Sequence, residues 1–203
     1  MPRSLPLLCA AGALIVLAGR LGAQSTGTPV FHAPYRLFDR YEIGGNVSDA
    51  GNITFEGFYG FSRPGVRWDL AIRGGIQDNG GHGRTAVLAG VDARFRVIDR
   101  SEDFPLDGAI ISGVGARLVS GASQLFIPFG ISLGRRLAFE NSSLTLVPYV
   151  EPVLGPAFGG GDTDLVVALG VGGDLRINRR FELRAAIGFG DIETFSIGFA
   201  VIR

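Results

Sequence analysis

The chain has 203 residues, a formal net charge of zero, 46% hydrophobic residues and a mean hydropathy of +0.30. This length fits one domain. The balanced charge gives no reason to expect a nucleic-acid partner, because proteins that bind nucleic acids usually carry a basic surface. The 32 glycines disfavour long helices, whereas the 15 phenylalanines favour strands.

The first 23 residues have the pattern of a secretory signal peptide. Arg3 supplies the positive charge, residues 5–18 are mostly apolar, and residues 21–23 form a small-residue cleavage site. No apolar run later in the chain approaches the roughly 20 residues of a membrane helix. Cys9 is the only cysteine and lies inside this segment, with Leu8 before it and most of the apolar stretch after it, which is the wrong order for lipidation. We therefore expect an exported chain without a disulfide.

Residues 24–40 are predicted to form an irregular periplasmic segment, because Pro29 and Pro34 interrupt any regular ladder. From Tyr41 onward, short segments of alternating apolar and polar residues follow one another, separated by turn residues. We predict one domain over residues 41–203, built from ten strands. Their expected ranges are 41–48, 52–62, 66–77, 84–98, 106–119, 123–135, 143–155, 164–177, 181–190 and 192–202.

The fourth segment shows the alternation clearly. Val87, Val91 and Phe95 occupy one set of positions, and Asp92 and Arg94 occupy the other. A membrane β-barrel has this period of two, with apolar side chains toward lipid and polar or small ones toward the lumen. A soluble barrel has the same period with the faces reversed. Strands of about 10–13 residues, glycines at the centre of the polar face and aromatic residues near strand ends favour the membrane barrel.

An even number of strands returns both chain ends to the same side of a membrane. The expected fold is therefore all-β, a closed antiparallel up-and-down transmembrane β-barrel of about ten strands with both termini in the periplasm. Eight strands would satisfy the same rule. Pro128, Pro148 and Pro152 fall inside strand patterns, so we expect bulges or an interrupted ladder between the sixth and seventh strands.

These alternating segments, over residues 41–203, resemble the small outer-membrane β-barrel proteins of Gram-negative bacteria, of the porin-like and OmpA-like class. The resemblance implies an outer-membrane location after removal of the signal peptide. It also implies membrane lipid and the barrel assembly machinery as partners. Barrels of this class usually end in an aromatic residue, whereas this sequence ends in Phe-Ala-Val-Ile-Arg at 199–203.

Many charged side chains share the face predicted to line the lumen. We expect carboxylates and arginines to pair across strands, because an unpaired buried charge is costly. A ten-strand barrel has a radius of roughly 10 Å, so a paired network of long side chains would plug it, and a less complete one would leave a narrow path for ions or small solutes. The predicted lumen residues are Glu42, Glu56, Arg67, Asp69, Arg73, Asp92, Arg94, Arg96, Asp107, Arg117, Glu151, Asp174, Arg176, Glu182 and Arg184.

Signals for catalysis and metal binding are weak. His82 and Asp78 are the one candidate pair for a barrel enzyme with a His/Asp site at its rim, and the glycines around them do not orient them. His32 and His82 lack the acids of a metal site, and Asp162 and Asp164 lack the further ligands of a calcium loop. We expect no enzyme activity, metal or cofactor. The predicted function is a structural barrel or narrow conduit, and the alternative is a soluble periplasmic ligand-binding barrel.

Overall fold

The computed structural model describes residues 31–35, 40–78, 85–121, 123–140 and 142–203. The predicted signal peptide, including Cys9, lies outside the described residues, and so does His82. Within the described ranges the regular elements are all strands, and none of the segments there is a helix that is long and apolar enough to cross a membrane.

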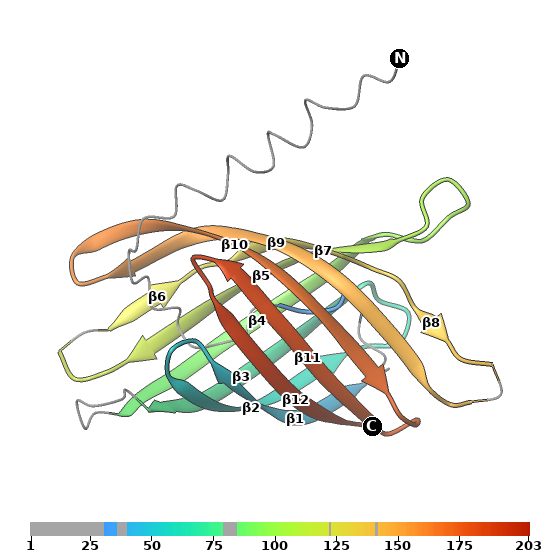
Figure 1. The fold of residues 1–203 in the computed structure, drawn as a ribbon, viewed down its shortest axis with the longest axis horizontal. Coiled ribbons are helices and arrows are strands. Elements are labelled where there is room, and N and C mark those ends of the chain that lie inside the picture. Colours follow the sequence, from blue (N-terminus) through green and yellow to red (C-terminus); the bar gives the residue numbers. More distant parts are fainter. Residues whose placement is uncertain (1–30, 36–39, 79–84, 122, 141) are drawn as a thin grey trace, which may run out of the picture.

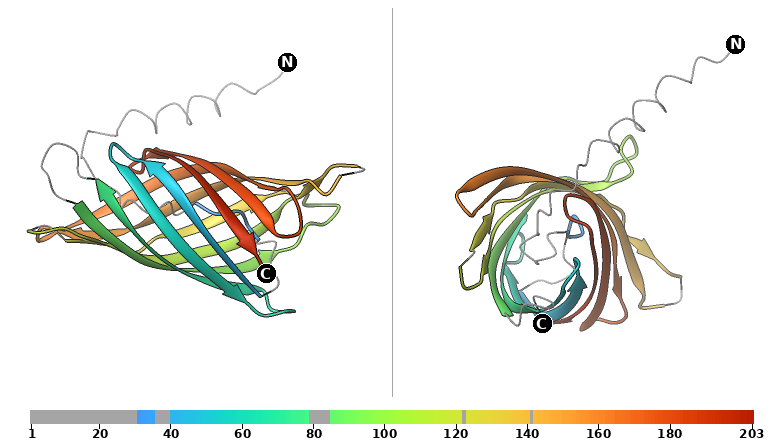
Figure 2. Two further views of the ribbon diagram at one scale, coloured as in Figure 1. Left: turned by 90° about the horizontal axis from the view of Figure 1, so that it is seen from below. Right: turned by 60° about the vertical axis from the view of Figure 1, so that its left-hand side comes forward.

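The strands form one antiparallel sheet in which the positions around the wall are filled in chain order. The first strand also pairs with the last, over eight residue pairs from Glu42–Ile202 to Asp49–Phe195, so the sheet closes into a barrel (Figures 1 and 2). The strands are β1 (Tyr41–Asp49), β2 (Ile53–Ser62), β3 (Trp68–Asp78), β4 (Thr85–Ile98), β5 (Asp107–Leu118), β6 (Gln124–Phe126), β7 (Phe129–Gly134), β8 (Leu137–Ala138), β9 (Thr145–Gly159), β10 (Asp162–Arg176), β11 (Phe181–Gly190) and β12 (Thr194–Ile202).

The short strands β6, β7 and β8 together occupy the sixth position in the wall, beside β9. The barrel therefore has ten strands, and the predicted closed antiparallel fold is confirmed. The break between β6 and β7 falls at Ile127 and Pro128, and Pro128 has no N–H to donate to a ladder. The Ile127 amide instead donates to the Pro156 carbonyl at 3.1 Å. The irregularity predicted between the sixth and seventh strands is thus present, whereas Pro148 and Pro152 lie within the continuous strand β9.

The hairpin of β9 and β10 is longer than the sequence predicted. The two strands pair over fifteen positions and turn at Gly160 and Gly161, which both have positive φ, of 63° and 94°. The expected strand ranges left residues 156–163 outside the ladder, but Phe158 and Gly159 continue it opposite residues 162 and 163. Since β11 pairs with β10 only from Ala168 onward, the tip of this hairpin projects beyond β11 (Figure 1).

The predicted faces agree with the structure. In β4, Val87, Val91 and Phe95 are about half exposed on the outside, whereas Asp92 and Arg94 are 5% and 3% exposed on the inside. The other long strands alternate in the same way. On the outward face of the described strands, the charged side chains are Asp49 and Asp78, each at the last residue of its strand. The barrel thus has an apolar exterior around a polar interior.

The two ends of the barrel differ in charge. We call the end that holds residues 40 and 203 the basic end, and the opposite end the acidic end. Among the exposed or half-buried described residues at its strand ends and turns, the acidic end carries carboxylates without arginine: Asp49, Asp78, Asp162, Asp164, Asp191 and Glu193. The basic end carries Asp99, Glu102, Asp103 and Glu140 and a larger number of arginines: Arg40, Arg63, Arg67, Arg100, Arg135, Arg136, Arg179, Arg180 and Arg203.

Candidate functional site in the barrel lumen

Residues 31–35 lie inside the barrel, a position that the prediction of an irregular periplasmic segment did not include. Phe31 and Ala33 are 4% and 1% exposed. Glycines in the wall make the room for the Phe31 ring: a Cβ atom at Gly170 would overlap the ring, and one at Gly188 would lie 2.7 Å from its Cε2 atom. Burial of an apolar ring is favourable, and the glycines at 170 and 188 leave the wall without a side chain where the ring lies.

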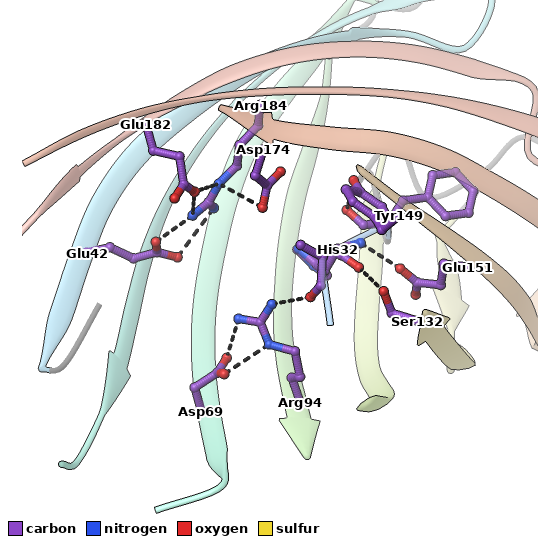
Figure 3. Close-up of polar contacts among 12 residues, drawn as sticks. His32, Glu42, Asp69, Arg94, Ser132, Tyr149, Glu151, Asp174, Glu182 and Arg184 are labelled. Atoms are coloured by element: carbon purple, nitrogen blue, oxygen red, sulfur yellow. Dashed lines mark hydrogen bonds and ion pairs between the residues drawn. The ribbon is translucent and has the colours of Figure 1, made fainter. Parts of the chain in front are cut away.

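The backbone at His32 is held from two strands of the wall (Figure 3). Its N–H donates to Oε2 of Glu151 on β9 at 2.6 Å, and its carbonyl accepts from the Ser132 hydroxyl on β7 at 2.5 Å. The imidazole Nε2 lies 3.6 Å from Oδ2 of Asp92 on β4. A buried extended backbone needs partners for its polar groups, and the inner wall supplies them here.

A third attachment runs through Arg94 of β4. Its guanidinium donates to both carboxylate oxygens of Asp69 on β3, at 2.9 and 3.0 Å, and to the Ala33 carbonyl at 2.5 Å. Bidentate arginine–carboxylate pairs are strong and directional. This buried pair therefore aims Nη1 of Arg94 at the inserted segment.

Tyr35 marks the exit of the segment toward the basic end. Its ring lies between two guanidinium groups, 5.5 Å from Arg96 and 5.2 Å from Arg136, measured to the ring centroid. Burial raises the pKa of the Tyr35 hydroxyl, and the neighbouring Arg136 charge opposes that rise. Cation–π contacts of this kind add to the attachment.

A second polar cluster lies next to the segment, around Arg184 of β11 (Figure 3). Its guanidinium contacts Glu42 of β1 at 2.5 Å, Glu182 at 2.7 Å and Asp174 of β10 at 4.0 Å. It also lies 5.1 Å from the centroid of the Phe58 ring. One guanidinium thus bridges carboxylates from three strands.

Most of the predicted lumen residues lie on the inner wall, and several others pair across strands as expected. Arg73 forms an ion pair with Asp92, and Arg96 contacts Asp107 at 3.3 Å. Arg117 instead donates a hydrogen bond to the uncharged side chain of Gln77 at 2.7 Å. The buried or half-buried predicted residues are Glu42, Glu56, Asp69, Arg73, Asp92, Arg94, Arg96, Asp107, Arg117, Glu151, Asp174, Arg176, Glu182 and Arg184.

Arg67 differs from the other predicted lumen residues. It precedes β3 at the basic end, its side chain is 55% exposed, and it pairs with Asp99 at 2.5 Å. The alternation places it on the inward side of the strand pattern, but the barrel wall ends before this residue, so it lies at the mouth. Asp78, one half of the weak His/Asp candidate, ends β3 at the acidic end. No group of three potential metal ligands occurs within the described ranges.

Little free space remains at the level of the inserted segment. The cavity between the segment and the Arg184 cluster has a volume of about 60 Å³ and is lined by Phe31, His32, Asp92, Tyr149 and Arg184 among others. This volume holds only a few water molecules. Sequence reasoning missed the contribution of residues 31–35, Ser132 and Tyr149. The available signal was the apolar side chains of Phe31 and Ala33 within a segment that was predicted only to be irregular.

No family model matches this chain, and no curated protein matches it in sequence. Among solved structures, the β domain of the Bordetella autotransporter BrkA aligns at 11% identity over 80% of this chain and 98% of that chain, with a TM-score of 0.55. Other matches are a de novo designed transmembrane β-barrel (15% identity, 79% and 92% coverage, TM-score 0.40) and the N-terminal β-barrel domain of Pseudomonas aeruginosa OprF (12% identity, 79% and 93% coverage, TM-score 0.33). The likeness to the BrkA domain concerns the fold alone.

Proposed function

We propose that this protein is an outer-membrane β-barrel without catalytic activity, whose lumen is closed at rest by its own residues 31–35. The observation that carries the proposal is an apolar exterior around a filled, charged interior. Outer-membrane lipid and the barrel assembly machinery are its proposed partners, and both termini are proposed to face the periplasm.

The dimensions of the exterior support a place in a bilayer. Ten strand residues tilted by about 45° span roughly 23 Å, close to the apolar band of about 25 Å in membrane barrels. Ile43, Leu154 and Leu165 are among the outward side chains and are 58%, 56% and 68% exposed. Soluble monomers rarely expose a continuous apolar patch of more than a few hundred Å². The reversed, soluble arrangement is therefore disfavoured.

Aromatic side chains on the outside near the basic end support a membrane interface there. The rings of Tyr41 and Tyr59 stack with centroids 6.2 Å apart, and Trp68 lies opposite Phe95 in the β3–β4 register. Tyrosine and tryptophan gather at membrane–water interfaces because one part of each ring system is apolar and another is polar.

The single tryptophan provides a test of membrane insertion. Trp68 is 36% exposed on the exterior. We expect brominated phosphatidylcholine to quench its fluorescence when the chain from residue 24 onward is refolded into vesicles. The matched control carries Trp68→Phe and Phe126→Trp, which moves the tryptophan to the interior, where quenching should be weak. Equal and weak quenching of both proteins, with the chain left in the aqueous fraction, would support the soluble barrel instead.

Planar-bilayer conductance tests the closed lumen. The chain from residue 24 onward should insert without discrete conductance steps, because the segment and the ion pairs fill the lumen. Deletion of residues 24–35 should produce steps, whereas deletion of residues 24–30 alone, which leaves Phe31 in place, should not. Steps of the same size from all three proteins would show that residues 31–35 do not close the barrel.

A second candidate function is a gated conduit for ions or small solutes. It is favoured by the way in which residues 31–35 are held, since no strand pairing joins these residues to the wall and their contacts with it include single hydrogen bonds and ring contacts. The same conductance records distinguish this candidate, because brief spontaneous openings of the intact protein would indicate gating and a silent record a structural barrel.

A further inference from the structure

We propose that the basic end of the barrel contains a binding site for a phosphate-bearing anion. An open cavity of about 1200 Å³ lies there, beside the end of the chain marked C in Figure 1. No aspartate or glutamate side chain of the described residues lines it, whereas Ser143, Thr145 and Asn178 add polar groups. We call it the arginine bowl, after the residues Arg40, Arg136, Arg176, Arg179, Arg180 and Arg203 that line it.

The backbone that carries these arginines is well anchored. In the turn between β10 and β11, the Asn178 side-chain oxygen accepts from the amides of Arg180 and Phe181, at 2.8 and 3.0 Å. The Arg180 carbonyl accepts from Ile202 of β12 at 2.8 Å. Arg203 exchanges two backbone hydrogen bonds with Tyr41, at 3.2 and 3.0 Å. The arginine side chains are thus presented from a formed rim rather than from a long free loop.

Among the described residues, the bowl is lined by arginines and by no aspartate or glutamate side chain. Within the described ranges, ion pairs at the basic end join Arg67 and Arg96 to Asp99 and Asp107, on the part of the mouth near β3–β5. Within the described chain, Arg179 and Arg180 form no ion pair with a carboxylate. Several guanidinium groups around one cavity repel one another, so the bowl favours an anion that they can share.

The chemistry of arginine indicates the class of anion. A guanidinium group presents its N–H donors in a planar fork that matches phosphate oxygens, and several such groups suit a multiply charged ligand. The phosphate could belong to the headgroup of an anionic phospholipid or to a free anion. The bowl lies beside Tyr41 at the proposed membrane interface, a height at which lipid headgroups are found.

The test compares two double variants with the same change in charge. Arg179→Gln with Arg180→Gln alters the bowl, and Arg63→Gln with Arg100→Gln removes two arginines of the basic end that do not line it. Inorganic pyrophosphate is titrated calorimetrically into each protein in uncharged detergent micelles. In a second arm, each protein is reconstituted in nanodiscs with mixed phosphatidylglycerol and phosphatidylcholine, and the lipid retained after extraction is identified by native mass spectrometry.

We expect the bowl variant to lose affinity by roughly tenfold, equivalent to about 1.4 kcal/mol, while the control variant stays near the wild type. If the bowl variant loses only pyrophosphate binding, the ligand is a free anion. If it loses only the retained phosphatidylglycerol, the ligand is the lipid headgroup. Absence of binding to the wild type in both arms, or equal losses in both variants, would overturn the proposal. The titration in micelles requires neither a closed lumen nor the natural membrane, so it tests the binding site separately from the proposed function.

Discussion

At the scale of single residues, the lumen depends on glycines as much as on charges. Phe31 occupies space that exists because residues 170 and 188 have no side chains. The polar residues of the wall then hold the adjacent backbone, most directly through Glu151, Ser132 and Arg94. The glycines thus leave room for the inserted segment, and the polar residues of the wall hold it there.

Gly170→Ala should displace the inserted segment, because its methyl group would overlap the Phe31 ring. Gly173→Ala is the matched control on the same strand, since its methyl group would lie 3.6 Å from the nearest atom, in ordinary contact with Leu146. We expect conductance steps from Gly170→Ala and a silent record from Gly173→Ala. Silence in both would mean that the ring can shift without opening the lumen.

Arg184→Met should destabilise the barrel strongly, because the carboxylates of Glu42, Glu182 and Asp174 would lose the cation they share. Removal of one partner of a buried ion pair costs about 3–5 kcal/mol. Arg63→Met, at an exposed position, should change the free energy of unfolding by less than about 0.5 kcal/mol. Urea unfolding followed by Trp68 fluorescence measures both, and equal effects would contradict the role given to Arg184.

At the scale of elements, the wall accommodates a broken sixth strand because the neighbouring strand β9 has a glycine where the two approach closely. At the break, the Ile127 carbonyl lies against Gly155 of β9, where a Cβ atom would overlap it. The amide of Gly113 on β5 donates to the Pro128 carbonyl at 3.2 Å, which keeps the interrupted strand attached on its other side. The proline and the glycine opposite it therefore form one structural unit.

Gly155→Ala should disturb this unit and lower the stability by about 1–3 kcal/mol, the usual cost of overpacking. Gly57→Ala on β2 is the control, because its Cβ atom would lie 3.8 Å from the nearest neighbour, the Gly44 carbonyl oxygen. Urea midpoints in detergent would reveal the difference. If the two alanine variants unfold at the same concentration, the close approach at residue 155 does not limit the fold.

At the scale of the whole molecule, closure between β1 and β12 removes the edges that an open sheet would expose. Unpaired backbone groups in lipid cost several kcal/mol each, so closure is a condition for a membrane barrel. The charged ends and the apolar wall are also properties of the whole barrel, and together they define the position that it would take along the bilayer normal.

A disulfide across the seam tests closure and register. Asp49 and Phe195 are Cα partners on the outward face of β1 and β12, and the chain from residue 24 onward has no cysteine. Asp49→Cys with Phe195→Cys should form an intramolecular disulfide on oxidation, detected by peptide mass mapping. Asp49→Cys with Thr194→Cys should not, because Thr194 points inward and is 8% exposed. Equal cross-linking of both pairs would contradict the register.

The strand order, the apolar outer face and the polar inner face could all be predicted from the sequence. They follow from a period of two that is readable within each segment, as in Val87, Val91 and Phe95 against Asp92 and Arg94. The interrupted sixth strand was also predictable, since Pro128 has no amide hydrogen. Such properties depend on neighbours in sequence, so they are visible before any tertiary contact is known.

Tertiary structure alone decided what fills the lumen. His32 meets Glu151 across 119 positions of sequence, and Arg184 meets Glu42 across 142. The arginine bowl likewise gathers residues from both ends of the domain and from the turn at Arg179. The alternation of apolar and polar residues within a strand predicts which face a side chain lies on, but not which distant group it contacts. That meeting depends on closure of the sheet and on the room left by glycines such as Gly170.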